Sequence, residues 1–345
     1  MECVSTKLKS NASALKMHPA LLVALSLVAS MLLYFLYALY RGLNFFEVFA
    51  GIGLKAALFT LLLLFLAETI KAVRLYLIVR MLGGNVTLWS CIVARLVGNF
   101  TGILTPGNIG AEPARVLSLA SLNGHPIESL IAAGVIESFY DALVLSLVAL
   151  SVGVQLLPRT VIVVLLSAIV LLLWAAGLTG LVFKESFWKR AVGYVARRAL
   201  SQALQRELLE RYRIFTLHVS RGLNAKLNLT GLALTLVSIA ITALSFIPLA
   251  AGDIASLQTL DLNDVSTYAV AYSMSFVMSV LPTPGGSGFF ELGLDIVLPA
   301  KLVLSWRMCF IAFSTIPTLI LVALTIKVRK VLIENILKSI SRGYA

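Results

Sequence analysis

The sequence has few charged residues for its length. Only 13% of the 345 residues are charged, while 59% are hydrophobic. A soluble domain has about 25% charged and about 45–50% apolar residues. The mean hydropathy is +0.97. This composition excludes an ordinary soluble globular protein, a disordered chain and a fibrous chain, and it predicts several membrane-spanning segments.

Cysteine and the short motifs of common enzymes are also scarce. The three cysteines, Cys3, Cys91 and Cys309, are too few and too scattered for a disulfide framework or a CxxC metal site. The chain has no Gly-Lys dipeptide, no H-E-x-x-H and no G-x-S-x-G, which argues against a P-loop ATP motor, a zincin-type site and a nucleophile elbow. We therefore expect no metal site, no cofactor and no catalytic residues.

Six apolar stretches of about 20 residues or more each predict a membrane-spanning helix. Helices are expected because an open β-sheet cannot satisfy its backbone hydrogen bonds in lipid. The six stretches are residues 19–40, 48–69, 129–157, 160–183, 227–252 and 308–326. Together with two broken segments described below, they predict an all-α, polytopic membrane protein that forms a single domain over residues 1–345.

Charged residues are distributed unevenly between these stretches. Basic residues outnumber acidic ones in residues 1–18, 71–80, 184–226 and 327–345, whereas 251–264 has three Asp and no Lys or Arg. Short cytoplasmic loops of membrane proteins are enriched in Lys and Arg. This rule predicts a plasma-membrane protein whose termini and basic segments are cytoplasmic. It also accounts for the net charge of +12 without a nucleic-acid partner.

The basic segment 184–226 has ten Lys and Arg against three Glu. Its large apolar residues recur at helical spacing: Leu200, Leu204, Leu208, Tyr212 and Phe215. This pattern predicts an amphipathic helix on the cytoplasmic membrane surface, where anionic lipid attracts basic side chains. A docking site for an acidic partner is the alternative.

Two further apolar segments, near 88–124 and 265–299, are interrupted by the same motif, T-P-G-x-x-G with a Glu close behind. The first copy consists of Thr105, Pro106, Gly107, Gly110 and Glu112. The second copy consists of Thr283, Pro284, Gly285, Gly286, Gly288 and Glu291. Proline ends a helix, and glycine permits the positive φ of a tight turn. Each segment is therefore predicted to be a re-entrant hairpin of two half-helices with its turn at membrane depth.

The two hairpins are predicted to be inverted copies of each other. Three predicted spans separate them, and an odd number of crossings turns the second copy upside down. Such inverted repeats are typical of transporters. The backbone amides where each second half-helix starts are predicted to bind an anion. The alternative is a pair of proline kinks in ordinary spanning helices.

Several ionisable residues lie in or beside the apolar segments: Glu112, Arg115, Glu137, Asp141, Glu291, Asp295 and Arg307. Each would cost about 3 kcal/mol at the bilayer centre, so we expect them to face an interior cavity and to compensate one another. Glu137 and Asp141 are four residues apart and share a helix face. We expect Arg115 or Arg307 to neutralise this pair. The alternative is a purely structural ion-pair network.

These motifs resemble those of the lysylphosphatidylglycerol synthase transmembrane family, also called flippase-like. Residues 71–83 resemble the arginine-rich segment after the family's second span. Residues 99–115 are similar to its P-G-x-x-G-E-x-x-R stretch, with an extra Ala111 before the acid. Residues 281–291 are similar to its P-T-P-G-G-x-G-x-x-E signature. Residues 137–141 resemble its E-R-x-x-D motif with serine in place of the arginine.

The resemblance extends over about residues 20–325 and implies a lipid flippase fold in which two re-entrant helices meet in a central cavity. It does not include the soluble aminoacyl-transfer domain that follows the membrane part of the family's best-known member. Lipid aminoacylation by this chain is therefore not expected.

The leading functional hypothesis is a transporter that moves a polar-headgroup lipid between leaflets. The expected substrate is an aminoacyl or glycosyl phospholipid, or a polyprenyl-phosphate-linked sugar. The turns would hold its phosphate, and the acidic cluster would hold a cationic or hydroxylated part. The alternatives are a membrane enzyme with Glu137 or Asp141 as base, and a non-catalytic membrane partner of a separate glycosyltransferase.

The charge pattern generates a first prediction, on topology. In a chain whose natural cysteines are replaced by serine, Gln205→Cys and Lys338→Cys should react with a membrane-impermeant maleimide only from the cytoplasmic side. Gln258→Cys should react only from outside, because its loop is acidic. Labelling of positions 205 and 258 from the same side would contradict the inverted repeat.

Overall fold

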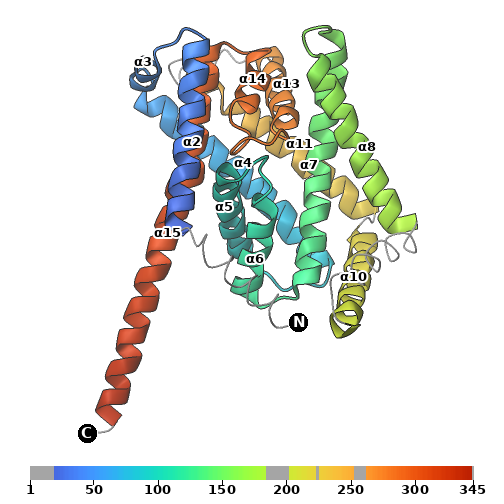
Figure 1. Cartoon of the computed structure of the whole chain (residues 1–345), viewed down its shortest axis with the longest axis vertical. Coiled ribbons are helices and arrows are strands. Elements are labelled where there is room, and N and C mark those ends of the chain that lie inside the picture. The colour runs from blue at the N-terminus through green and yellow to red at the C-terminus, as the bar shows by residue number, and fades with distance from the viewer. Residues whose placement is uncertain (1–18, 184–201, 223–224, 252–261, 344–345) are drawn as a thin grey trace, which may run out of the picture.

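The computed structural model of the chain describes residues 19–183, 202–222, 225–251 and 262–343 (Figure 1). These residues form helices and no β-strand beyond one isolated bridge between two turns. Five of the described helices are long and apolar enough to cross a membrane. The prediction of an all-α, polytopic membrane protein is therefore confirmed.

The helices are labelled as in Figure 1. They are α2 (Pro19–Tyr40), α3 (Phe45–Ala50), α4 (Leu54–Met81), α5 (Leu88–Leu104), α6 (Ala111–Asn123), α7 (Ile127–Gln155), α8 (Val161–Phe183), α10 (Gln202–Gly222), α11 (Ala225–Leu244), α12 (Ile247–Ala251), α13 (Leu262–Met278), α14 (Phe289–Asp295) and α15 (Ala300–Gly343).

The long helices α2, α4, α7, α8, α11 and α15 surround two short helical hairpins, and the C-terminal part of α15 extends beyond the other helices (Figure 1). The hairpin α5–α6 occupies the lower half of the view, and the hairpin α13–α14 occupies the upper half. Their turns therefore meet in the middle of the bundle. Helix α3 lies at the upper end and α10 at the lower end.

Helix α4 differs from the span expected at 48–69. The apolar run is broken at residues 51–53, between α3 and α4, where Gly51 and Gly53 interrupt the helix. Helix α4 then continues to Met81, so Lys71 and Arg74 are buried inside it. The expectation that 71–80 is a basic loop is wrong for these two residues, because each is paired with a carboxylate inside the protein.

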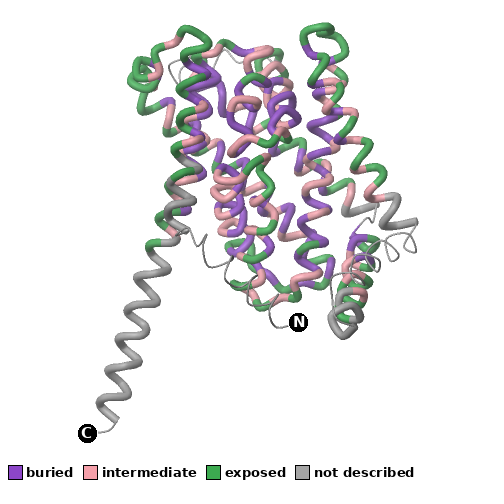
Figure 2. The backbone as a smooth tube through the Cα atoms, in the orientation of Figure 1, coloured by how far each residue is buried: buried purple, intermediate pink, exposed green. Residues whose placement is uncertain are grey.

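Buried residues fill the centre of the bundle, whereas the outer faces of the peripheral helices are exposed (Figure 2). Helix α8 is an example, since Leu172 and Leu173 are 68% and 67% exposed. In a soluble protein such a face would be unfavourable, but lipid solvates it. The polar residues lie inside instead, which places the candidate site in the interior of the bundle.

Helix α10 covers most of the described part of the predicted amphipathic segment. Residues 184–201 and 223–224 lie outside the described residues, and residues 225–226 begin α11. It packs on α7, where Arg211 pairs with Glu128. Val219 is buried in the same core cluster as Ile136, and Phe215 packs against that cluster. This part of the apolar face is therefore covered by protein.

Candidate functional site

The two T-P-G turns lie against each other in the middle of the bundle. The amide of Gly107 donates to the carbonyl of Thr283, and the amide of Gly285 donates to the carbonyl of Thr105, each at 3.0 Å. The central prolines of the two motifs thereby form an isolated antiparallel bridge. The two copies of the motif thus make equivalent hydrogen bonds to each other.

Both turns require glycine, because the backbone there has a positive φ and because neighbouring backbone atoms leave little room for a side chain. Gly107 and Gly285 each have φ of +58°, in the left-handed region that side chains rarely adopt. A Cβ atom on Gly285 would lie 2.8 Å from the carbonyl oxygen of Ile103, and one on Gly107 would lie 3.2 Å from that of Val280. The bridge therefore depends on two glycines that allow two backbones to approach closely.

The amides that were expected to bind an anion are occupied in this conformation. Those of Gly107 and Gly285 form the bridge. The amide of Gly110 donates to the hydroxyl of Thr105 at 2.8 Å, and that of Gly288 donates to the carboxylate of Glu291 at 2.5 Å. These four amides are therefore not available to an anion in this conformation.

A cluster of buried and half-buried charges lies beside the turns, on α4 to α7. We call it the central ion cluster. It consists of Glu68, Lys71, Arg74, Arg95, Glu112, Arg115, Glu137 and Asp141. Its four carboxylates balance its four cations, which is the condition for burying charge at tolerable cost.

Arg74 and Arg95 neutralise the acidic pair on α7. Arg74 binds both carboxylate oxygens of Asp141, at 2.7 and 2.9 Å, and also lies 3.2 Å from Glu137. Arg95 binds Glu137 at 2.7 Å and Glu68 at 2.8 Å. These contacts join α4, α5 and α7 through charged hydrogen bonds, which are stronger than neutral ones.

Arg74 and Arg95, rather than the expected Arg115 or Arg307, are therefore the closest cationic partners of the Glu137 and Asp141 pair. Arg115 pairs with Glu112 in its own helix, and its distance to Glu137 is 4.0 Å. It also donates to the side chain of Asn99 at 3.2 Å. Arg115 thus lies at the edge of the cluster rather than at its centre.

Arg307 of α15 belongs to a second buried site, beside the turn of the α13–α14 hairpin. Its guanidinium lies 2.8 Å from Glu291 and donates to the carbonyl of Gly285 at 2.9 Å and to the hydroxyl of Tyr34 at 3.1 Å. It also lies 4.3 Å from the ring centre of Phe290. Arg307 therefore connects this turn to α2, α14 and α15.

Asp295, at the end of α14, lies apart from both groups of charges. Its carboxylate pairs with Arg41 at 3.0 Å, and the Arg41 side chain is 40% exposed. This pair joins α14 to the segment that follows α2. It is a structural contact near the surface rather than part of the candidate site.

A cavity of about 100 Å³ lies between the central ion cluster and the Arg307 site. Its charged and amide lining consists of Glu68, Lys71, Arg95, Asn99, Asn108, Arg115, Asp141 and Arg307. The four cations outnumber the two carboxylates. Within the described part of the chain, the buried Nδ2 of Asn99 and Nε of Arg115 have no hydrogen-bond partner. These features favour an anionic ligand.

The structure brings many of the predicted residues to this central cavity, but in different roles. Arg115, Asp141 and Arg307 line it directly. Glu112, Glu137 and Glu291 do not line it, and each pairs with an arginine that does. The motif residues of both turns form or support the bridge beside it.

Sequence reasoning missed Glu68, Lys71, Arg74 and Arg95 as site residues. Glu68, Lys71 and Arg74 are spaced by three residues, which is compatible with one face of a continuing helix. That spacing was the available signal. It was overlooked because a cluster of basic residues after an apolar run also fits a cytoplasmic loop.

Residues 20–301 match the family described as the lysylphosphatidylglycerol synthase TM region. The matched stretch contains both hairpins and the whole central ion cluster, whereas Arg307 lies beyond it. The comparison with curated proteins gave no match, and neither did the comparison with solved structures.

The bridge between the turns generates the second prediction. Gly285→Ala should destabilise the protein by at least about 1–2 kcal/mol, the cost of a side chain in the left-handed region, plus the clash with Ile103. Gly107→Ala should destabilise it somewhat less. Thermal unfolding in detergent measures both. Gly177→Ala on α8 is the control, because its new Cβ would meet nothing within 4 Å. Equal melting temperatures for all three variants would contradict the bridge.

The third prediction concerns the ion cluster. Arg95→Gln should destabilise the protein by about 3 kcal/mol or more, because it leaves buried carboxylates with fewer partners. Adding Glu137→Gln should recover part of this loss by restoring charge balance.

The matched control is Arg211→Gln, whose partners lie at the surface and whose loss should cost about 1 kcal/mol or less. A double-mutant cycle compares the unfolding free energies of Arg95→Gln, Glu137→Gln and the double variant with that of the wild type. Strict additivity of the two cluster substitutions would show that Arg95 and Glu137 are not coupled.

Proposed function

The chain belongs to the lysylphosphatidylglycerol synthase TM family, and on this premise we propose that it is a flippase for a lipid with a phosphate-containing head group. Family membership supports a membrane role related to lipids. The observation that carries the finer proposal is the central cavity, whose lining has four cations and two carboxylates.

Among the chemical groups of lipid head groups, phosphate fits this lining best. Arginine and lysine are the side chains that recognise phosphate oxygens, and Arg95, Arg115 and Arg307 reach the cavity from three different helices. The carboxylates of Glu68 and Asp141 provide acceptors for ammonium or hydroxyl groups on the same head group. Aminoacyl phospholipids, glycosyl phospholipids and polyprenyl-phosphate sugars all combine these two features.

The size of the central cavity indicates a closed conformation. A volume of about 100 Å³ is below the roughly 300–1,000 Å³ of typical ligand sites. The cavity must widen to accept its substrate. The bridge between the turns consists of two hydrogen bonds. We propose that the α13–α14 hairpin moves away from α5–α6, because α13 and α14 carry no residue of the central ion cluster.

The opposed hairpins provide a route for alternating access. Inverted repeats let one half of a transporter rock against the other around a fixed site, and here the hairpins reach the middle from opposite ends of the bundle (Figure 1). We propose that the cavity opens to one leaflet and then to the other. The proposed setting is the plasma membrane, with both termini cytoplasmic.

We propose transport rather than catalysis as the activity of this chain. The carboxylates that would serve as a base are each held by an arginine, Asp141 by two hydrogen bonds and Glu137 by contacts from Arg74 and Arg95. A separate lipid-modifying enzyme or glycosyltransferase is a proposed partner, because it would supply the lipid that this protein moves.

The fourth prediction tests transport in reconstituted vesicles with fluorescent phospholipids. Arg115→Gln should slow leaflet transfer at least tenfold, because it removes a cation that faces the cavity, while Arg115→Lys should retain part of the rate. Arg115 is the best probe, since its side chain is 11% exposed and its partner Glu112 is 37% exposed. Thermal unfolding in detergent verifies that both Arg115 variants are folded.

Lys55→Gln on α4 is the charge-matched control, because Lys55 is exposed and outside the cavity. Mass spectrometry of the lipids after the assay should show no change of mass. A product of altered mass would indicate an enzyme. Equal transfer by wild type, Arg115→Gln and empty vesicles, together with co-purification of a transferase, would indicate a non-catalytic membrane partner.

A further inference from the structure

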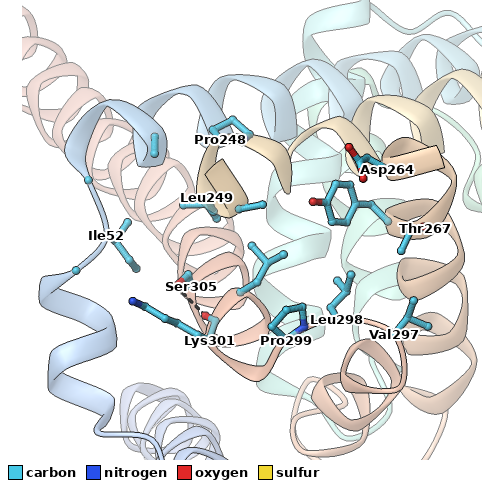
Figure 3. A pocket seen from close by; sticks show the side chains of 16 residues that line it. Ile52, Pro248, Leu249, Asp264, Thr267, Val297, Leu298, Pro299, Lys301 and Ser305 are labelled. Atoms are coloured by element: carbon cyan, nitrogen blue, oxygen red, sulfur yellow. Dashed lines mark hydrogen bonds between the residues drawn. The ribbon is translucent and has the colours of Figure 1, made fainter. Parts of the chain in front are cut away.

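A second cavity, of about 630 Å³, lies at the end of the bundle that carries α3 and α12 (Figure 3). It shares no lining residue with the central cavity. Its walls form where helices are interrupted: at Gly51 to Gly53 before α4, along α12, and at Val297 to Pro299 before α15. The volume falls within the range of small-molecule binding sites.

The second cavity is separated from the central one by stacked aromatic rings. Tyr268 lines the second cavity and stacks on Phe246, with ring centres 5.5 Å apart. Phe246 stacks on Trp306 at 4.4 Å, and Trp306 lies parallel to Phe290, which lines the central cavity. Trp306 is fully buried. The two cavities are therefore distinct sites in this conformation.

Two opposite charges face the second cavity across an apolar floor. Figure 3 shows Asp264 of α13 and Lys301 of α15 on opposite sides, with Leu249 and Leu298 between them. Both charged side chains are exposed, and no ion pair joins them. A ligand that satisfies both must therefore carry a cation and an anion some distance apart, together with apolar surface.

The neighbouring helix α3 has features that are typical of the membrane interface. Its Phe46 and Phe49 are 71% and 62% exposed although α3 also carries Glu47. Short segments with exposed aromatic residues beside charged ones are typical of the membrane interface. Lipids that reach the cavity from the membrane would thus present their head groups to Asp264 and Lys301.

We propose that the second cavity binds a zwitterionic phospholipid of the phosphoethanolamine type. Its primary ammonium binds Asp264, its phosphate binds Lys301, and the glycerol and first acyl carbons lie on the apolar floor. A primary ammonium has three N–H donors for the carboxylate and for the nearby hydroxyls of Thr267 and Tyr268. A choline group has no such donors and is recognised through aromatic cages, whereas Tyr268 is the one aromatic ring that the described residues contribute to this lining. This site does not depend on the transport proposal.

The fifth prediction concerns lipid affinity, which titration calorimetry measures on the full chain in detergent. The short-chain lipids are used below their own critical micelle concentrations. Dihexanoyl phosphatidylethanolamine should bind at least tenfold more tightly than dihexanoyl phosphatidylglycerol, which lacks the ammonium. Asp264→Asn should abolish this preference. Lys301→Gln should weaken the binding of both lipids.

Glu210→Gln and Lys55→Gln are the charge-matched controls, because both residues are exposed and neither lines the cavity. Arg115→Gln should keep the preference for phosphatidylethanolamine over phosphatidylglycerol, because the second cavity sets this preference through Asp264. Melting temperatures verify that each variant is folded, and Asp264→Glu should keep the preference. Equal affinity of the wild type for the two lipids, or an unchanged preference in Asp264→Asn, would overturn the proposal.

Discussion

The structure depends on the pairing of backbone polar groups where two turns meet inside the bundle. A turn frees amide and carbonyl groups that a continuous helix would satisfy, and in lipid each unpaired group costs several kcal/mol. Here Gly107 and Gly285 each donate to the other turn, so neither turn is satisfied alone. The two hairpins must therefore reach the same depth from opposite ends. The helices around them enclose this point and keep it away from lipid.

A second constraint, the burial of charge, determines what lies beside the turns. Four carboxylates and four cations are gathered on α4 to α7, and Arg74 and Arg95 hold most of them together. This balance permits a polar cavity in a protein whose outer surface is apolar. The whole cluster has equal numbers of carboxylates and cations. The lining of the central cavity, by contrast, has more cations than carboxylates. Internal neutrality and a positive binding surface are thus combined in one network.

Much of the architecture was predictable from local features. Apolar runs predicted the long helices, and the repeated proline and glycine motif predicted two helical hairpins with tight turns. The start of α4 was missed, because the apolar run continues through Gly51 and Gly53. The partners of Glu137 were also missed, since pairing of Arg95 with that residue depends on how α5 packs against α7. Spacing along the sequence can place charges on a helix face, but it does not say which other helix lies opposite.

The stacked aromatic column also has a spectroscopic consequence. Trp306 lies in this column between the two cavities, and its indole N–H donates to the hydroxyl of Ser245 at 2.7 Å. Indole emission depends on the polarity around the ring, and Trp306 is fully buried. By contrast, Trp89 is 63% exposed on α5. A chain in which the other three tryptophans are replaced by phenylalanine would therefore carry a single indole, at the point that must rearrange if the two cavities connect.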